Sequence, residues 1–168
     1  MICRDAVVED ARALAQVSVE AWQAAYTGLM PADYLAGLDT TDGAKRFEQA
    51  IRAGRSILVL ELDSSVVGFS FYASSRDDDA SPVTGEVIAI NLLPAHWRRG
   101  LGRVLLEETV RRLHQDGFSD ATLWVLHDND RARQFYEALG WLSDGGEKHD
   151  DKLTGFPLHE VRYRRRLP

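Results

Sequence analysis

PAHWRRGLGRVLLEETVRRL, the stretch from Pro94 to Leu113, joins an apolar segment to an amphipathic helix. The segment before it, Glu86–Leu93 (EVIAINLL), is almost continuously apolar, which is typical of a strand buried on both faces. From Gly100 to Gln115 the apolar residues recur at helical spacing, while arginines and glutamates take the opposite face. Two glycines and several arginines therefore lie where a central strand ends and a helix begins.

This junction has the chemistry of an anion-binding site. A helix N-terminus carries unpaired N–H groups and a partial positive charge, and glycines let another molecule's phosphates approach the backbone. Arg98, Arg99 and Arg103 add full positive charges at the same place. We therefore expect a phosphate, and most simply a pyrophosphate, to bind here. The alternative is a tight turn with solvated arginines.

The same stretch excludes two large classes of phosphate-binding protein. The chain has no G-x-x-x-x-G-K-[ST] sequence, so it is not a P-loop NTPase. Leu105 stands where the third glycine of the dinucleotide-binding G-x-G-x-x-G motif would be, so that motif fails too.

The composition indicates an ordinary globular protein. The chain has 168 residues, 45% of them hydrophobic and 27% charged, and we expect one domain spanning residues 1–168. Without a signal peptide, an apolar run of membrane-spanning length or a cysteine besides Cys3, we expect a cytoplasmic protein with no membrane contact. The net charge of −6 argues against nucleic-acid binding and mildly favours cationic partners.

Helical and strand patterns alternate along the rest of the chain. We expect a strand at Ile2–Arg4, helices at Val7–Tyr26 and Asp42–Ala53 with a short turn of helix at Asp33–Leu38 between them, and a hairpin of Ser56–Leu62 with Val66–Ala73. After the central strand and helix we expect a strand at Asp120–Leu126, a helix at Asp130–Leu139 and a strand at Leu158–Arg166 with room for one more beside it. The order predicts a mixed sheet with helices against it. We expect Asp77, Asp78 and Asp79 to form a solvated loop tip rather than a metal site.

The strand, the proline and the Arg-x-Gly-x-Gly turn resemble motif A of the GNAT N-acetyltransferases. The family's hexad is Gln/Arg-x-x-Gly-x-Gly/Ala; here it reads WRRGLG, so Trp97 departs from the first position. A second segment, Asn129–Trp141 (NDRARQFYEALGW), is similar to the family's N-x-x-A-x-x-F-Y-E-x-x-G-F/W sequence. AWQAAYTGLMPADYL and PLHEVRYRRRL also resemble bacterial members, so the resemblance covers essentially the whole chain.

The resemblance implies an α+β (mixed α/β) fold and an enzymatic function. The fold would be a central mixed, mostly antiparallel sheet of about seven strands, splayed between the fourth and fifth and flanked by about four helices. The function would be an acetyl-CoA-dependent N-acetyltransferase in which a primary amine attacks the thioester directly, without a metal. A small-molecule or peptide amine would be the acceptor, and a homodimer would be common in the family. A noncatalytic acyl-CoA sensor and a protein lysine or N-terminal acetyltransferase are the alternatives.

The resemblance also implies which residues hold coenzyme A. The N–H of Ile90 would polarise the thioester carbonyl at the start of the splay, and the backbone of Leu92 would pair with the pantetheine arm. Asn129 would contact the pantetheine or cap its helix. The remaining implied contacts come from Leu93, Arg98, Arg99, Gly100, Leu101, Gly102, Arg103, Arg131, Ala132 and Phe135.

Two residues are candidates for proton transfer. Tyr136 matches the family's general-acid position, and a tyrosine with an ordinary pKa near 10 could protonate the departing thiolate. Glu86 matches the glutamate base of histone-type members, four residues before Ile90, but it could be a solvated bystander at a strand end.

The acceptor groove is expected between the first helices and a late hairpin. There the resemblance points to Trp22, Tyr26 and Tyr34, with Met30 and the 150–156 segment, although these aromatic residues could instead pack on the sheet. The acidic balance makes a cationic small amine or a peptide amine the favoured acceptor. No two histidines have the i, i+4 spacing of a helical zinc site, so no metal is expected.

Overall fold

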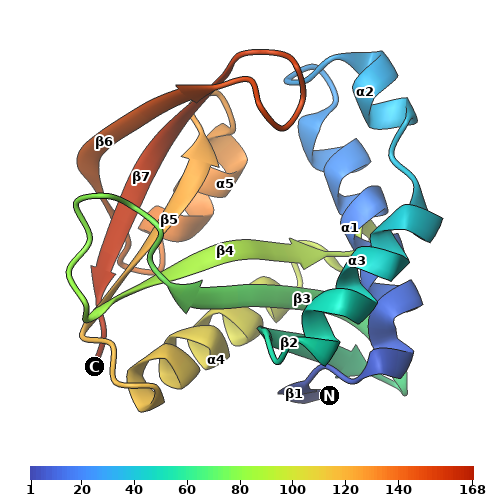
Figure 1. Ribbon diagram of the computed structural model, residues 1–168, viewed down its shortest axis with the longest axis horizontal. Coiled ribbons are helices and arrows are strands. Elements are labelled where there is room, and N and C mark those ends of the chain that lie inside the picture. The colour runs from blue at the N-terminus through green and yellow to red at the C-terminus, as the bar shows by residue number, and fades with distance from the viewer.

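The computed structural model describes all residues, 1–168 (Figure 1). One sheet holds seven strands, in the order β1-β2-β3-β4-β5-β7-β6. The strands are β1 (Ile2–Asp5), β2 (Ser56–Leu62), β3 (Ser65–Ser74), β4 (Thr84–Leu92), β5 (Asp120–Leu126), β6 (Leu142–Asp150) and β7 (Leu158–Arg166). The helices are α1 (Ala11–Tyr26), α2 (Ala32–Ala36), α3 (Thr40–Arg52), α4 (Leu101–Gln115) and α5 (Asp130–Glu137).

The seven-stranded, mostly antiparallel sheet confirms the expected α+β fold, since only β4 and β5 run parallel. Five helices flank it, where about four were expected, because α2 is a separate helix of five residues. Strand β6 was not assigned from the sequence, because Gly145 and Gly146 interrupt it and most of its side chains are exposed. Its extended state comes from pairing with β7, with an irregular register between Ser143 and Glu147.

Two helix starts differ from the expected ones because acidic side chains set them. The Asp10 carboxylate accepts the Val7 N–H at 2.8 Å and a hydrogen bond from Arg4 at 2.7 Å. Residues Val8–Asp10 then form one 3-10 turn, and α1 begins at Ala11 rather than at Val7. Similarly, Asp39 accepts the N–H groups of the first turn of α3, so this helix begins at Thr40.

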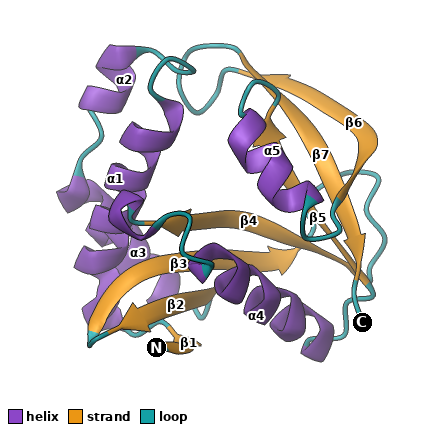
Figure 2. Ribbon diagram, turned by 180° about the vertical axis from the view of Figure 1, so that it is seen from behind, coloured by secondary structure: helices purple, strands orange, loops and turns teal.

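Helices cover both faces of the sheet. On one face α1 packs Leu14 and Val17 against Ile57, Val59 and Phe69 of strands β2 and β3. On the other face lies α4, whose buried leucines join Leu58, Leu60 and residues of β5 and β7 in the larger core. Figure 2, seen from behind, brings α4 and α5 to the front, so these two helices share one side of the molecule. Successive side chains of β2 point to opposite faces of the sheet, and both faces are covered by helices, so the sequence of β2 is apolar almost throughout.

Strands β4 and β5 separate soon after they pair. Their parallel pairing covers only Thr84–Glu86 and Asp120–Thr122, and Figure 1 shows β5 turning away from β4 beyond that point. Beside it, β4 has a bulge: Phe71 and Tyr72 of β3 face Ala89 and Val87, which leaves Ile88 as an extra residue. The splay between the fourth and fifth strands is confirmed, but it opens after Glu86, four residues before the expected position at Ile90.

The open end of this gap is bridged by the first helices. Met30 and Leu35, at the ends of the α1–α2 connection and α2, are buried against Leu126 of β5 and Leu158 of β7. Trp22, Tyr26 and Tyr34 are partly buried against the same cluster. The α1–α2 segment therefore joins the two halves of the sheet on the face opposite α4 and α5. No helix is both long and apolar enough to cross a membrane.

Candidate active site

The turn between β4 and α4 has an unusual backbone. After a 3-10 turn at Pro94–His96, Arg98 has φ +60° and Gly100 has φ +79°, both in the left-handed region. A non-glycine residue in this region carries strain, which is often found at functional sites. Gly100 is the N-cap of α4 without a side-chain cap, and the first helical bond runs from Val104 N–H to the Gly100 carbonyl at 3.2 Å. Its free N–H groups belong to Leu101, Gly102 and Arg103.

Positive charge gathers at the same helix end without a counterion. None of Arg98, Arg99, Arg103 and Arg131 forms an ion pair with a carboxylate, and Arg99 contacts only His96 Nδ1, at 3.2 Å. Elsewhere arginines mostly pair, as Arg162 does with three aspartates. Free amides and unpaired guanidinium groups at one place match the chemistry of a phosphate site.

The β4 backbone presents unpaired groups to the gap. The Leu93 N–H donates to Val67 of β3 at 2.9 Å. Since successive N–H groups of an antiparallel strand point to opposite sides, those of Ile90 and Leu92 point away from β3. Both residues lie beyond the last β4–β5 pair, so their N–H groups face the gap. This side of β4 is therefore a strand edge within the sheet, open to an added extended chain.

Trp97, which departs from the family hexad, contacts both sides of the gap. Its indole Nε1–H donates to the Leu92 carbonyl at 2.7 Å, and the Arg131 guanidinium carbon lies 3.9 Å from the centroid of its ring. Arg131 belongs to the first turn of α5, so this stack joins the β4–α4 turn to α5. Nearby, a methyl group on Gly102 would lie 3.4 Å from the Phe135 ring, so these helices are already in close contact.

The other implied cofactor residues lie around this junction. Asn129 is buried, and its side-chain oxygen accepts the Ala132 N–H at 3.2 Å. Of the two roles expected for Asn129, pantetheine contact or helix cap, the structure shows the helix cap. Leu93, Leu101, Ala132 and Phe135 are partly buried against the larger core. The structure thus brings the implied cofactor residues from β4, α4 and α5 together around the gap, with α4 and α5 on the same face of the sheet (Figure 2).

Tyr136 is buried among aromatic rings on α5. Its ring centroid lies 5.3 Å from Phe135 and 6.5 Å from Trp141, and its hydroxyl has no hydrogen-bond partner in the protein. Burial raises the pKa of Tyr136, and the nearby Tyr26 adds to the shift. The hydroxyl is therefore protonated at neutral pH and free to donate.

Glu86 is buried at the point where the strands part. It is 2% exposed, and its carboxylate accepts hydrogen bonds from Arg76 Nη2 at 2.7 Å, from Arg76 Nε at 3.1 Å and from the Arg76 N–H at 3.1 Å. The sequence reasoning missed Arg76, which lies in the β3–β4 loop. An arginine within an acidic loop was the available signal, since Glu86 would need a cation if buried.

The β3–β4 loop is anchored to β7 by ion pairs. Arg162 of β7, 8% exposed, donates to Asp79 at 2.6 Å, to Asp144 at 2.9 Å and to Asp77 at 3.2 Å. Trp124 Nε1–H also donates to Asp77, at 3.0 Å. The expectation of a solvated tip was therefore wrong for Asp77, whose side chain is 17% exposed, because a guanidinium 85 residues away in sequence binds it in the folded chain. Asp79 stays 63% exposed, as expected, although it pairs with the same guanidinium.

The expected groove residues combine packing with polar contact. Trp22 and Tyr26 stack edge to face with centroids 5.0 Å apart. Burial raises the pKa of Tyr26 to about 12, and the Glu160 carboxylate adds to the shift. Tyr26 therefore lies near Tyr136 and Glu160, and also near Arg131, whose positive charge partly offsets the pKa shift.

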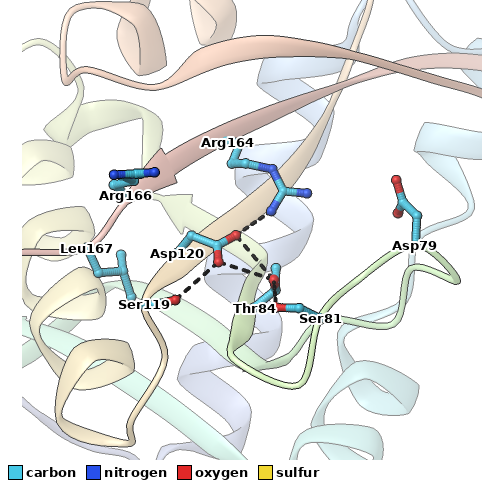
Figure 3. A pocket seen from close by; sticks show the side chains of 8 residues that line it. All are labelled: Asp79, Ser81, Thr84, Ser119, Asp120, Arg164, Arg166 and Leu167. Atoms are coloured by element: carbon cyan, nitrogen blue, oxygen red, sulfur yellow. Dashed lines mark hydrogen bonds and ion pairs between the residues drawn. The ribbon is translucent and has the colours of Figure 1, made fainter.

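A separate polar pocket lies at the closed end of the gap. It has a volume of about 540 Å³ and is lined by Asp79, Ser81, Thr84, Ser119, Asp120, Arg164, Arg166 and Leu167. Figure 3 shows Asp120 bound by Arg164 and by the hydroxyls of Thr84 and Ser119. None of the motif residues lines this pocket, so it lies apart from the candidate site.

Comparisons with known proteins agree with this geometry. Residues 19–141 match the model of the acetyltransferase (GNAT) family. The chain is 32% identical over 159 residues to the N-acetyltransferase YuaI of Bacillus subtilis, covering 94% of this chain and 88% of that protein. The PaiA N-acetyltransferase of Thermoplasma acidophilum, solved with coenzyme A, has a TM-score of 0.73 at 18% identity, over 98% of both chains. YncA of Salmonella typhimurium, solved with acetyl-CoA, has a TM-score of 0.74 at 20% identity, over 100% of this chain and 94% of that one. The two solved structures show a shared fold.

Proposed function

Because the chain belongs to the GNAT acetyltransferase family, we propose that it transfers the acetyl group of acetyl-CoA to a primary amine. The family membership confirms the resemblance seen in the two motifs and makes the protein an acyltransferase. We further propose that residues 1–168 act as one domain with acetyl-CoA as cosubstrate.

Coenzyme A fits the chemistry of the residues at the α4 end of the gap. The free N–H groups of the first turn of α4 would donate to its pyrophosphate, and the unpaired side chains of Arg98, Arg99 and Arg103 would neutralise it. The backbone of Leu92 would hold the pantetheine amides as a neighbouring strand would. When bound, acetyl-CoA supplies the activated acyl group.

The proposed reaction needs one acid and one electrophilic donor. The acceptor nitrogen bonds to the thioester carbon, the carbon–sulfur bond breaks, and coenzyme A leaves as the thiol. The Ile90 N–H donates to the carbonyl oxygen as negative charge develops there. Tyr136 gives its proton to the departing sulfur, and it holds that proton at neutral pH because burial raises its pKa.

The amine must also lose a proton. An alkyl amine with a pKa of about 10.4 is neutral in only about one molecule in 10³ at pH 7. We propose that Glu86, on the same strand as Ile90, accepts that proton through water. Arg76 then acts as a positioning residue, because its three hydrogen bonds fix the carboxylate where the strands part.

The gap between β4 and β5 carries the proposal. Its strand edge ends at an uncapped helix N-terminus with unpaired arginines, and α5 carries Tyr136, whose hydroxyl has no partner in the protein. A noncatalytic acyl-CoA sensor would use the arginines but would not need a free, protonated Tyr136 hydroxyl.

Release of free coenzyme A thiol from acetyl-CoA tests the proposal. The amine panel holds polyamines, aminoglycosides, amino acids and short peptides with a lysine or a free N-terminus. Tyr136→Phe should lower amine-dependent release by about 10²- to 10⁴-fold. Tyr72→Phe is the matched control, because Tyr72 is buried on β3 in the core beside α4. Bound acetyl-CoA without release for any amine would favour the sensor, and turnover of peptides alone would favour the protein acetyltransferase.

A further inference from the structure

An ammonium group is already bound on the acceptor face of the sheet. Lys148 of β6 places its Nζ 3.3 Å from Glu160 Oε2 of β7 and 4.3 Å from the ring centroid of Trp124 on β5. A carboxylate beside an aromatic face is a general solution for binding an alkyl ammonium ion. The three side chains come from three neighbouring strands, so the sheet itself sets their spacing.

This corner lies on the same side of the sheet as the helices that bridge the gap. Trp124 and Leu126 are two residues apart and therefore point to the same face of β5, and Leu158 and Glu160 likewise share a face of β7. Leu126 and Leu158 pack against the α1–α2 segment, so Trp124 and Glu160 face the same space. The Glu160 carboxylate also adds to the raised pKa of Tyr26, whose main cause is burial, which agrees with its facing α1.

The indole is held in place by other residues, and the carboxylate is more shielded from solvent than the lysine. The Trp124 ring is fixed by its hydrogen bond to Asp77 and by Arg162, whose guanidinium carbon is 5.5 Å from the ring centroid. Glu160 is partly buried, with 23% of its side chain exposed. Lys148 extends from the edge strand β6 and is 37% exposed, and it makes no other ion pair.

The surrounding charges leave room for another cation. Six carboxylates and four cations join the ion-pair network on this face, and the unpaired Arg166 of β7 adds a fifth cation, so the carboxylates exceed the cations by one. The carboxylates are those of Asp77, Asp79, Glu86, Asp120, Asp144 and Glu160, and the cations are Arg76, Lys148, Arg162 and Arg164. An incoming ammonium would therefore meet a net negative field.

We propose that Glu160 and the face of Trp124 form a subsite for a second ammonium group of the acceptor, which Lys148 occupies until that acceptor binds. The acceptor class is then an alkyl diamine or a longer polyamine: one nitrogen is acetylated and another is held by Glu160. This inference rests on the proposed function, because it assigns a substrate class to the same site.

A matched pair of acceptors isolates the second charge. 1,5-Diaminopentane and pentylamine have the same carbon chain, but only the diamine can place an ammonium at Glu160. With acetyl-CoA at saturation, the KM of the diamine should be about tenfold lower than that of pentylamine. Glu160→Gln should raise the KM of the diamine about tenfold and leave that of pentylamine unchanged. Lys148→Met should lower the KM of the diamine, because the subsite is vacated.

Glu147→Gln is the control, because Glu147 lies next to Lys148 but pairs with His159 instead. It should leave both acceptors unaffected. Equal KM values for the two acceptors, or an equal rise for both in Glu160→Gln, would overturn the subsite.

Direct binding separates this inference from the proposed function. 1,5-Diaminopentane is titrated calorimetrically into the protein loaded with coenzyme A. If no amine is acetylated, the reaction proposed above fails, whereas diamine binding that weakens in Glu160→Gln and strengthens in Lys148→Met still supports the subsite. Diamine binding that neither variant changes, or no binding at all, would refute it.

Discussion

Replacing Arg162 by methionine tests whether the β3–β4 loop is held by one guanidinium. Methionine keeps much of the apolar stem beside Trp124 but removes every hydrogen bond to Asp77, Asp79 and Asp144. The variant should also free the loop that carries Arg76, and Glu86 would then lose the residue that positions its carboxylate.

The structure gives the size of the effect. Removing one partner of a buried ion pair costs about 3–5 kcal/mol. Asp79 is 63% exposed and regains water, so the loss falls on Asp77 and Asp144, at 17% and 18% exposure. The low end, about 3 kcal/mol, is therefore expected. In a chain of this length each kcal/mol lowers Tm by about 2–4 °C, so Tm should fall by about 6–12 °C at pH 7.

The effect should depend on pH with a definite sign. Burial opposes ionisation of Asp144, but hydrogen bonds from the Gly146 N–H, Arg162 and Arg164 outweigh it and lower the pKa of this carboxyl. A carboxyl with a folded pKa below its unfolded value stabilises the fold above the unfolded pKa, here 3.8. That stability is lost as pH falls through the folded pKa. The difference in Tm between wild type and variant should therefore shrink below about pH 4.

Scanning calorimetry at pH 7 and pH 3 measures both quantities. Arg166→Met is the matched control, since Arg166 lies on the same strand but is exposed and has no carboxylate partner. Its Tm should change by less than about 2 °C. A similarly small change for Arg162→Met at pH 7, or a large one that does not decrease between pH 7 and pH 3, would refute the reasoning.

Three further substitutions test the backbone around the gap. A methyl group at Gly100 would contact no atom within 4 Å, but the φ of +79° should strain the turn of Gly100→Ala by about 1–2 kcal/mol. This strain should weaken acetyl-CoA binding severalfold, as measured by calorimetry. An unchanged Kd would contradict the role of this turn. Trp97→Phe frees the Leu92 carbonyl and should tighten acetyl-CoA binding by about 2- to 10-fold, so weaker binding would show that the indole supports the cofactor instead. Gly68→Ala would press a methyl group onto the Leu92 side chain and within 2.9 Å of the Asn91 carbonyl oxygen. Its Tm should drop by about 2–12 °C in a thermal melt, and an unaltered Tm would mean that β3 and β4 can move apart.

Local patterns allowed the central elements to be predicted. The apolar run of β4 and the helical spacing of α4 each lie within one short window, and Gly100 marks their junction. The splay was predicted from the family resemblance alone, because no residue pattern in β4 indicates the bulge at Ile88 that accompanies it.

Long-range pairing accounts for what was missed. Strand β6 has no strand pattern of its own and is extended because β7 pairs with it. The ion pair of Arg76 with Glu86, and the contacts of Arg162 with the β3–β4 loop, join residues that are adjacent only after folding. A charged loop can be read from sequence, but the buried partner that orders it cannot.

The unpaired edge of β4 has a consequence for solubility. An exposed strand edge is a template on which other extended chains can assemble, and proteins normally protect such edges. In the proposed function this edge holds the cofactor, so a proline or a bulge along its whole length would block binding. Bound coenzyme A would then cover the edge and protect the protein against aggregation. The protein should aggregate less on warming when coenzyme A is present than when it has been removed.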